Sequence, residues 1–461
     1  MRKYSLFRGA VLIITAAILG LSGSEIASRA QDLSGSMGEM VDTPSSAHRS
    51  RSSRRTNTLR RSAHSARKAQ PPKRTPDAES YNAQGLELSN TGHYAEAIEA
   101  FTKATSLKPD YAEAYLNLGY AYDESGKYEQ AIEPLKQAIR LNPADAEAQS
   151  YLGTSYFNLG RFTEAIAAYR EAVRLKPDDA GMHYDLGNAY DNAEQPARSI
   201  DEFKEAIRLK PDYGDAYAAL GDDYYDGKRF ALAAESYKHA IQYNVKDPEV
   251  ERNLGDSYRI LQRYEEAIDA YKEAIKLKSD DAETYHGLGL ALGRLRRWSE
   301  AVEAFQQAVK LQPDNARYYS NLGGAYDNLG RFAAALEPLK KAISLDPKLG
   351  PAYYNLGRAH NRLGHQLEAL ANFKQAISLN PNSAEAYERL GNVYGNLGRW
   401  KDAIEADKQV IRLKPMYAEA HYNLGYAFYR DGNKDAALQQ YRILKNLSPE
   451  MANRLYALIS K

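Results

Sequence analysis

Glycine recurs every 34 residues along most of this chain of 461 residues, and that interval constrains the fold more than any other feature. The series runs without a slip in register through positions 85, 119, 153, 187, 221, 255, 289, 323, 357, 391 and 425. A fixed period of this length indicates a stack of supersecondary units, each of which buries its apolar face only against its neighbours. The sequence therefore predicts a solenoid whose function lies on an extended surface.

Each unit is expected to be a helix, a tight turn and a second helix. In the unit that begins at Ala316, the residues Tyr319, Leu322, Gly323 and Tyr326 follow the i, i+3, i+4 and i+7 spacing of one helical stripe. A second stripe follows the turn at residues 328–330. The repeating unit is therefore a helical hairpin.

Small residues are expected to hold the two helices of each hairpin together. Gly323, like Gly119 in an earlier unit, and Ala335 allow the backbones to approach closely, while Tyr326 and Leu339 fill the space around that contact. A larger side chain at Gly323 would overpack the joint. Pro347 ends the second helix, because proline lacks an N–H group and disfavours helix in the residue before it.

This pattern resembles the tetratricopeptide repeat, which has Leu-Gly at positions 7 and 8, an aromatic residue at 11, alanine at 20 and 27, an aromatic residue at 24 and proline at 32. Position 8 is glycine in all eleven units, and position 20 is alanine in ten, with Ser199 as the exception. The resemblance covers residues 78–451 in units that begin at Ala78, Ala112, Ala146, Ala180, Gly214, Pro248, Ala282, Ala316, Gly350, Ala384 and Ala418. It implies an all-α, right-handed superhelical α-solenoid.

Two departures from the pattern carry expectations of their own. Proline is missing at position 32 of the fifth and sixth units, where Val245 and Ser279 stand, so we expect a softer joint over about residues 245–282. After the last unit, residues 452–461 are expected to form a capping helix with Leu455 and Leu458 facing inward.

Residues 1–30 have the three-part form of a secretory signal peptide. Arg2, Lys3 and Arg8 precede an apolar run over residues 9–23, and small residues suited to cleavage follow it. That run is short for a membrane span, which needs about 17–25 residues, so cleavage is favoured over retention as a signal anchor in the membrane. Either interpretation places the repeats outside the cytoplasm, as a periplasmic or secreted protein or one anchored in the inner membrane.

Residues 31–77 are expected to form a disordered basic linker rich in serine, arginine and proline. Residues 49–74 hold ten Lys or Arg and no acid. A solvated spacer is the favoured interpretation, because no aromatic residue interleaves the arginines to stack on a base. The alternative is an arm that binds nucleic acid or another anionic polymer.

Several classes of site are excluded or disfavoured by the sequence. The chain has no cysteine, which excludes disulfides, thiolate zinc sites and thiol nucleophiles. Its nine histidines show no metal-ligand spacing. His183 and His421 occupy position 4 of their units, where a packing role is expected. We predict no catalytic residue, no cofactor, no metal and no small-molecule substrate.

The resemblance implies that first helices line an inner groove through positions 2, 5, 6, 9, 12 and 13, and that a peptide or a partner's helix lies along it. At these positions the second to fifth units supply acids, among them Asp123, Asp185, Asp191, Asp222 and Asp226. The later units supply Arg252, Arg294, Arg358, Arg362, Arg389 and Arg430. We hypothesise a groove that is acidic at one end and basic at the other, and that orients a bipolar segment. The simpler interpretation is that these charges only solubilise a large face.

Five asparagines share position 6 of their units: Asn117, Asn253, Asn321, Asn355 and Asn423. The series resembles the asparagine ladder in the repeat superhelix of O-linked N-acetylglucosamine transferases, here without a catalytic domain. That resemblance implies holding of peptide backbones, to which an amide side chain both donates and accepts hydrogen bonds.

The sequence thus predicts a non-enzymatic protein–protein interaction scaffold of the cell envelope that binds extended peptides or partner helices in its groove. One alternative is a partner-recruiting subunit of a glycosyltransferase or another enzyme. A second alternative is binding of an anionic polymer or nucleic acid through residues 49–74. Membrane association through residues 9–23 is a further expectation.

Overall fold

The computed structural model describes residues 77–461 as helices joined by short turns, with no strand in that range. The expected signal or anchor segment and nearly all of the basic linker lie outside the described residues. The helices fall into two compact units, which we call the N-terminal body (residues 77–279) and the C-terminal body (residues 280–461). The boundary between them lies within residues 245–282; softness there stays a prediction.

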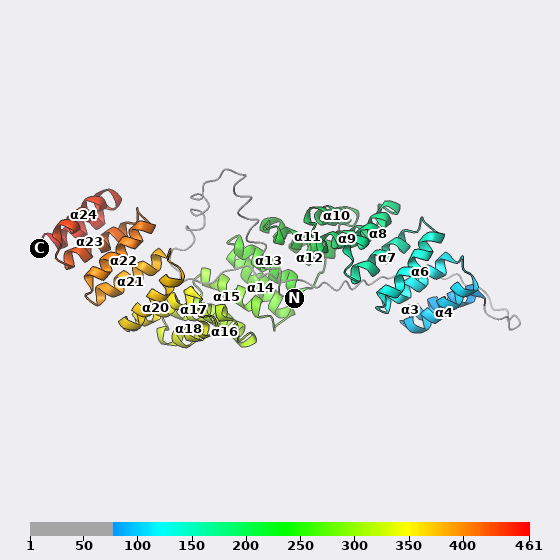
Figure 1. Ribbon diagram of the computed structural model, residues 1–461, viewed down its shortest axis with the longest axis horizontal. Coiled ribbons are helices and arrows are strands. Elements are labelled where there is room, and N and C mark those ends of the chain that lie inside the picture. The colour runs from blue at the N-terminus through cyan, green and yellow to red at the C-terminus, as the bar shows by residue number, and fades with distance from the viewer. Residues whose placement is uncertain (1–76) are drawn as a thin grey trace. The chain divides into compact units, whose positions relative to one another are not determined.

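The described helices pair into eleven hairpins. Figure 1 shows the two helices of a hairpin side by side, for example α7 with α8 and α21 with α22. The first helices are α3 (Ala78–Asn90), α5 (Ala112–Glu124), α7 (Ala146–Asn158), α9 (Ala180–Asn192), α11 (Gly214–Asp226), α13 (Pro248–Ile260), α15 (Ala282–Arg294), α17 (Ala316–Asn328), α19 (Gly350–Arg362), α21 (Ala384–Asn396) and α23 (Ala418–Arg430). Each begins at the residue where the sequence places the start of a unit.

The second helices follow turns of three residues. They are α4 (Tyr94–Leu107), α6 (Tyr128–Leu141), α8 (Phe162–Leu175), α10 (Pro196–Leu209), α12 (Phe230–Gln242), α14 (Tyr264–Leu277), α16 (Trp298–Leu311), α18 (Phe332–Leu345), α20 (Gln366–Leu379), α22 (Trp400–Leu413) and α24 (Lys434–Leu447). Helix α25 (Pro449–Ile459) follows the last hairpin.

In the first ten repeats the glycine at position 8 lies directly beneath the side chain at position 24 of its own hairpin. A Cβ atom added to Gly323 would lie 2.4 Å from Cγ of Leu339, and one added to Gly85 would lie 2.6 Å from the ring of Phe101. Such distances are too short for real carbon atoms, so a side chain at position 8 would force the helices apart. The expected close approach at Gly323, Ala335 and Leu339 is confirmed, with Ala335 and Leu339 fully buried.

Polar caps start many of the first helices. The side chain before the helix accepts a hydrogen bond from a first-turn N–H group, as Asp145 does from Glu147 at 3.0 Å and from Ala148 at 3.1 Å. Asp77, Asp179, Asp247, Asp281, Asn315 and Ser383 act in the same way. The proline two residues before most of these caps ends the preceding second helix, as Pro347 does after α18.

The turn within each hairpin requires a left-handed residue at position 15. Seven repeats have glycine there, with φ between 68° and 86°. Repeats four to seven instead have Glu194, Lys228, Gln262 and Arg296, with φ between 57° and 61°. Because a side chain in this region costs about 1 to 2 kcal/mol, the middle repeats hold backbone strain that the outer repeats lack.

The fifth repeat replaces its missing proline with a different helix end. Helix α12 is one residue shorter than the other second helices, and Asn244 adopts φ of 65°. The Asn244 N–H donates to the Ile241 carbonyl at 3.0 Å, and the Val245 N–H donates to the Ala240 carbonyl at 3.0 Å. This is the bond pattern of a Schellman motif, which ends a helix without proline.

Helix α25 covers the last hairpin, but with a different inward face from the one expected. Ala452, Leu455 and Ile459 are buried, whereas Leu458 is half-buried, so the prediction for Leu458 is wrong. The helix begins at Pro449, three residues before the expected start at 452. Leu455 takes the place over the repeat glycine, because a Cβ atom on Gly425 would lie 2.5 Å from its Cδ2.

Replacing Gly323 with alanine is expected to lower the free energy of unfolding of the C-terminal body by about 1 to 3 kcal/mol, because the new methyl group overlaps Leu339. The measurement is the midpoint of denaturant unfolding followed by circular dichroism. Gly395→Ala is the matched control on α21: its methyl group meets Trp400 at an ordinary 3.4 Å, so the helix should gain about 0.5 to 1 kcal/mol. Equal shifts in both variants would contradict the packing argument.

Candidate functional site

Neighbouring first helices lie in contact from α3 to α13 in the N-terminal body and from α17 to α21 in the C-terminal body, so their side chains form a shared surface there. We define the first-helix face by positions 5, 6, 9, 12 and 13 of the repeats in each body. Position 2 is left out because it lies in the first helical turn, where an acid stabilises the helix dipole whatever the surface does.

On the N-terminal body the first-helix face carries mainly carboxylates. It holds seven acids against the two guanidiniums of Arg252 and Arg259. The acids are Asp123, Glu124, Asp185, Asp191, Asp222, Asp226 and Asp256. Arg252 and Arg259 are buried, and Arg259 forms an ion pair with Asp256 at 3.0 Å. The acids expected of the second to fifth units thus lie on this body, together with Arg252, which was expected among the basic residues of the later units. A groove that is acidic at one end stays a prediction.

On the C-terminal body the same positions carry five arginines against two acids, Asp327 and Glu388. Arg358 forms an ion pair with Asp327 at 2.7 Å and donates to Asn328 Oδ1 at 3.3 Å. Burial raises the pKa of Asp327, while the guanidiniums of Arg358, Arg362 and Arg389 oppose that rise. We call Asp327, Arg358, Arg362 and Arg389 the arginine cluster. Because three guanidinium groups lie around one carboxylate, the arginine cluster keeps a net positive charge.

Asp327, which was not among the expected site residues, partly neutralises the basic end of the predicted groove. Two other arginines of this face lie outside the cluster: Arg294 precedes it and is half-buried, and Arg430 follows it, is exposed and covers the ring of Trp400 at 4.4 Å. The Arg430 guanidinium also donates to the Tyr426 hydroxyl at 2.7 Å. The basic character is thus strongest at the arginine cluster.

The asparagines at position 6 link neighbouring repeats. Asn117 donates to Asn82 at 3.0 Å, Asn253 to Asp222 at 3.3 Å, and Asn321 is 2.8 Å from His286 Nε2. Asn321 and Asn355 are only 0 % and 1 % exposed, whereas Asn117 and Asn423 are half-buried. The face therefore presents only part of the asparagine series, and a peptide-holding role stays a prediction.

Two more pairs of polar residues cross between repeats or helices. Ser155 donates to the buried Asp123 at 3.0 Å. Ser199, the one departure from alanine at position 20, donates to Asp223 at 2.5 Å and is completely buried. A buried carboxylate needs a hydrogen-bond donor, so the carboxylate of Asp223 accounts for the serine that replaces alanine at position 20 of the fourth repeat.

A cavity of about 280 Å³ lies beside the arginine cluster in the C-terminal body. Its lining residues are Gly350, Pro351, Tyr354, Ala376, Asn380, Ser383 and Ala386. Tyr354 also interacts with the Arg389 guanidinium. The cavity is therefore lined by both apolar and polar residues and lies next to the Arg389 guanidinium.

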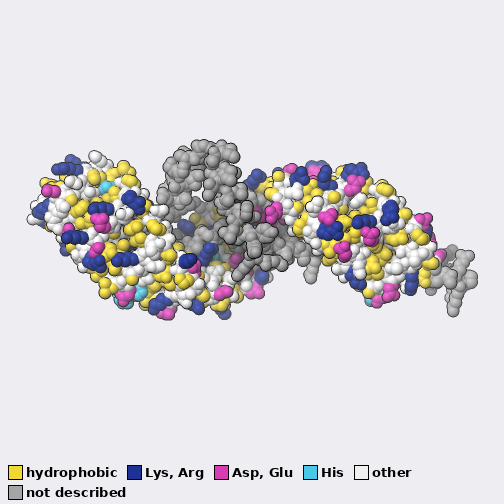
Figure 2. Space-filling model, viewed as in Figure 1, with side chains coloured by type: hydrophobic (Ala, Val, Ile, Leu, Met, Phe, Trp, Pro, Cys, Tyr) yellow, Lys and Arg dark blue, Asp and Glu magenta, His cyan; other side chains and the backbone are white. Residues whose placement is uncertain are grey.

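Charges on the second helices are arranged differently. There, acids and bases alternate within one helix turn, as in Arg174 with Glu171 and Arg208 with Glu205, both at 2.6 Å. Figure 2 shows Lys or Arg interspersed with Asp or Glu over much of the surface in view. Such pairs neutralise each other, so the one-sided charge of the first-helix face is a feature of that face.

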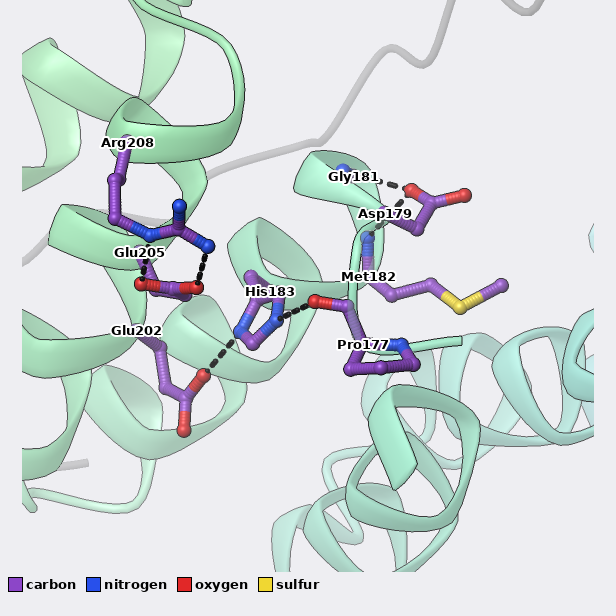
Figure 3. A network of polar contacts seen from close by, with 8 residues as sticks. All are labelled: Pro177, Asp179, Gly181, Met182, His183, Glu202, Glu205 and Arg208. Atoms are coloured by element: carbon purple, nitrogen blue, oxygen red, sulfur yellow. Dashed lines mark hydrogen bonds and ion pairs between the residues drawn. The ribbon is translucent and has the colours of Figure 1, made fainter. Parts of the chain in front are cut away.

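His183 is buried where α9 meets α10, as expected for position 4 (Figure 3). Its Nδ1 lies 2.7 Å from Glu202 Oε2, and its Nε2 lies 3.0 Å from the Pro177 carbonyl oxygen. Because both partners accept hydrogen bonds, the ring satisfies them fully only when both nitrogens carry protons. The Glu202 carboxylate accordingly raises the pKa of His183.

His421 occupies the same position with a neutral partner. Its Nδ1 lies 2.8 Å from Gln440 Oε1, and its Nε2 lies 2.9 Å from the Pro415 carbonyl oxygen. The two histidines thus form equivalent bridges between a first helix, the preceding turn and a second helix. Their role is structural, and the described residues contain no group of three or more acids, histidines or cysteines that could hold a metal.

Asp407 occupies position 24 of the tenth repeat, where the other repeats have an aromatic residue or leucine. It is 3 % exposed, and its Oδ1 lies over Gly391, 2.7 Å from where a Cβ atom would be. Burial, with a smaller contribution from Glu388, raises the pKa of Asp407 to about 8. A carboxyl group thus fills a core position, which the repeat pattern did not predict.

Models of known families match most of the described chain. Residues 78–247 match the model described as the cilia and flagella-associated protein 70 C-terminal domain. Residues 255–295 and 362–398 match a TPR repeat model, and residues 286–349 and 389–452 match a tetratricopeptide repeat model. The comparison with curated proteins gave no significant match.

Solved structures similar to the chain include YrrB, described as "a TPR protein with an unusual peptide-binding site". It is 22 % identical over 41 % of this chain and 96 % of its own, with a TM-score of 0.39. MamA is 30 % identical over 34 % of this chain and 93 % of its own, with a TM-score of 0.34. The APC/C assembly Cut9–Hcn1 is 14 % identical over 83 % of this chain and 96 % of its own, with a TM-score of 0.45.

Changing Glu202 to glutamine gives His183 a neutral partner, as Gln440 is for His421 in the eleventh repeat. With its pKa raised, His183 stabilises the folded state below its unfolded pKa of about 6.5, and that stability is lost as pH rises through the higher folded pKa. Glu202→Gln should therefore flatten the pH dependence of the unfolding free energy above about pH 6.5. Gln440→Glu is the reciprocal control, and should introduce such a dependence. If the slope of unfolding free energy against pH were unchanged in both variants, the proposed pairing of His183 with Glu202 would be contradicted.

Replacing Asp407 with leucine should raise the unfolding free energy of the C-terminal body by about 1 to 3 kcal/mol at pH 8, because a buried carboxyl group is removed. The wild-type folded state holds the Asp407 proton up to about pH 8, whereas the unfolded chain loses it near pH 4. Stability should therefore fall as pH rises through that window.

Leu135 and Leu339 already pair with repeat glycines, so leucine fits this position. The control for Asp407→Leu is Asp407→Asn, which should remove the pH dependence without filling the site. Denaturant unfolding at several pH values measures both variants. A wild-type unfolding free energy that stays constant between pH 4 and pH 8 would contradict the raised pKa of Asp407.

Proposed function

Because the chain belongs to the tetratricopeptide repeat family, we propose that it is a non-enzymatic protein-interaction scaffold of the cell envelope, with the first-helix face as its binding surface. Tetratricopeptide repeats bind proteins or peptides and are typically non-catalytic, and no catalytic domain was identified in this chain. The ligand we infer is an extended peptide or a partner's helix that crosses several repeats.

The observation that carries the proposal is the contrast in charge between equivalent positions of the two bodies. The N-terminal body presents seven acids and two arginines, and the C-terminal body presents five arginines and two acids. If these residues served only solubility, the alternating acid–base pairs of the second helices would be expected here as well. The segregated sign supports recognition of segments with complementary charge.

The arginine cluster is the part of the face best suited to an acidic segment. Arg362 is exposed, and Arg358 keeps 17 % of its side chain exposed while paired with Asp327. Guanidinium groups bind carboxylates through paired hydrogen bonds, and the neighbouring cavity at Tyr354 offers space for an apolar side chain. We therefore assign an acidic peptide with an apolar anchor to this site.

The proposed setting rests on residues 1–30, whose sequence favours export from the cytoplasm. In residues 77–461, no helix is both long and apolar enough to cross a membrane. Determination of the mature N-terminus by mass spectrometry distinguishes a cleaved signal from an anchor. The alternative of a recruiting subunit for a glycosyltransferase or another enzyme predicts enzymatic activity that co-purifies with the chain.

Changing Arg362 and Arg389 to glutamine should weaken binding of a fluorescent Glu-Ser repeat peptide, measured by anisotropy at low salt, by about fivefold to thirtyfold. Arg358 is kept, since its removal would leave Asp327 buried beside no cation. Lys341→Gln with Lys374→Gln is the control, because both lysines are exposed on second helices of the same body. Equal affinity of wild type and the arginine variant would refute the assignment.

A further inference from the structure

The acids of the fourth and fifth repeats form a compact part of the first-helix face. Asp185 and Asp191 lie on α9, and Asp222 and Asp226 lie on α11; these helices are in contact. Asp226 is exposed, and the other three are half-buried. We call these four residues the acidic face. Positions 5, 6, 9, 12 and 13 of these two repeats contain no Lys or Arg.

A buried amide lies in the middle of the acidic face. Asn188 lies one helical turn from both Asp185 and Asp191, and it is only 9 % exposed. Its side-chain oxygen meets no hydrogen-bond donor in the structure. A buried acceptor without a donor costs about 1 to 3 kcal/mol, and a ligand that supplies an N–H group removes that cost. The acidic face is therefore suited to a cationic ligand rich in N–H donors.

Such donors are abundant in the arginine-rich segment of the same chain. Residues 49–74 contain eight arginines among ten basic residues, with no acid, and they end three residues before the N-cap Asp77 of α3. We call residues 49–74 the basic arm. Arginine matches carboxylates in geometry as well as charge, and guanidinium groups in general also stack on aromatic rings. Tyr184 and Tyr225 on these helices supply such rings.

The basic arm is long enough to reach the acidic face. The distance from α3 to α11 covers four steps between neighbouring first helices. Since packed helices lie about 8 to 10 Å apart, this distance is at most about 40 Å, and α9 is one step nearer. An extended segment of 26 residues spans up to about 85 Å. Attachment through three residues also gives the arm an effective concentration in the millimolar range, which a free basic peptide rarely reaches.

We propose that the basic arm binds in cis to the acidic face of the N-terminal body and covers it. A basic partner segment then reaches this face only by displacing the arm. The arm is favoured over a separate ligand because it is tethered beside a surface of opposite charge. This inference concerns the acidic face and not the arginine cluster, so its failure leaves the proposed binding of acidic peptides untouched.

The test uses the full chain and a fluorescent synthetic peptide with the sequence of residues 49–74. We call the chain with Arg54, Arg55, Arg60 and Arg61 changed to glutamine the arm variant. These changes should release the basic arm from the acidic face. The peptide should then bind the arm variant at least about tenfold more tightly than the wild type at low salt, because the wild-type arm competes in cis.

Further changes in the arm variant locate the binding surface. Asp191→Asn with Asp226→Asn should weaken peptide binding by about fivefold to thirtyfold, and Asn188→Ala should weaken it as well. Asp201→Asn with Glu235→Gln is the charge-matched control, because both acids are exposed on second helices of the same body, and it should leave the affinity unchanged. Circular dichroism checks that all variants stay folded.

Three results would overturn the proposal. The first is equal peptide affinity for the wild type and the arm variant, and the second is a loss of affinity in the second-helix control as large as in the face variant. The third is a wild type that sediments as a dimer while the arm variant sediments as a monomer, which would place the arm on a second copy of the chain.

Discussion

The contact between the glycine at position 8 and the side chain at position 24 is the constraint on which the other features of the structure depend. It sets how closely the two helices of a hairpin approach, and therefore which surface the first helices present to the outside. The side chain over the glycine varies widely: it is Phe101, Leu135 or Tyr169 in the first three repeats. The contact thus requires a residue without a side chain on the first helix and a side chain that fills the space on the second helix.

The last two repeats show how far this contact tolerates change. In the tenth repeat Asp407 fills the place over Gly391, so a carboxyl group is buried among apolar side chains. In the eleventh repeat Leu455 of α25 fills the place over Gly425, so the helix that covers the solenoid end also completes its last core position. Each shows that the space over the glycine must be filled, while the chemistry and origin of the filling group are free.

The period of the sequence predicted the position of every first helix, because glycine, alanine and proline act through short-range sterics that sequence spacing records. It did not predict the helix end at Asn244 or the inward face of α25, where Ile459 is buried instead of Leu458. Those features depend on packing between elements, which spacing alone does not specify. The left-handed turns at Lys228 and Gln262 were missed for a related reason: there the surrounding hairpin imposes the conformation against local preference.

For the candidate site, the sequence located the charges but could not say which are shared between repeats. Asp327 lies one repeat before Arg358, and Asp123 one repeat before its donor Ser155, so each pair is recognised only once neighbouring first helices are placed side by side. These contacts neutralise some of the charge on the face and leave the rest at the surface. A solenoid with fixed core positions can therefore change its ligand by changing charges at positions 5, 6, 9, 12 and 13, since none of these supplies the glycine contact that holds the hairpin together.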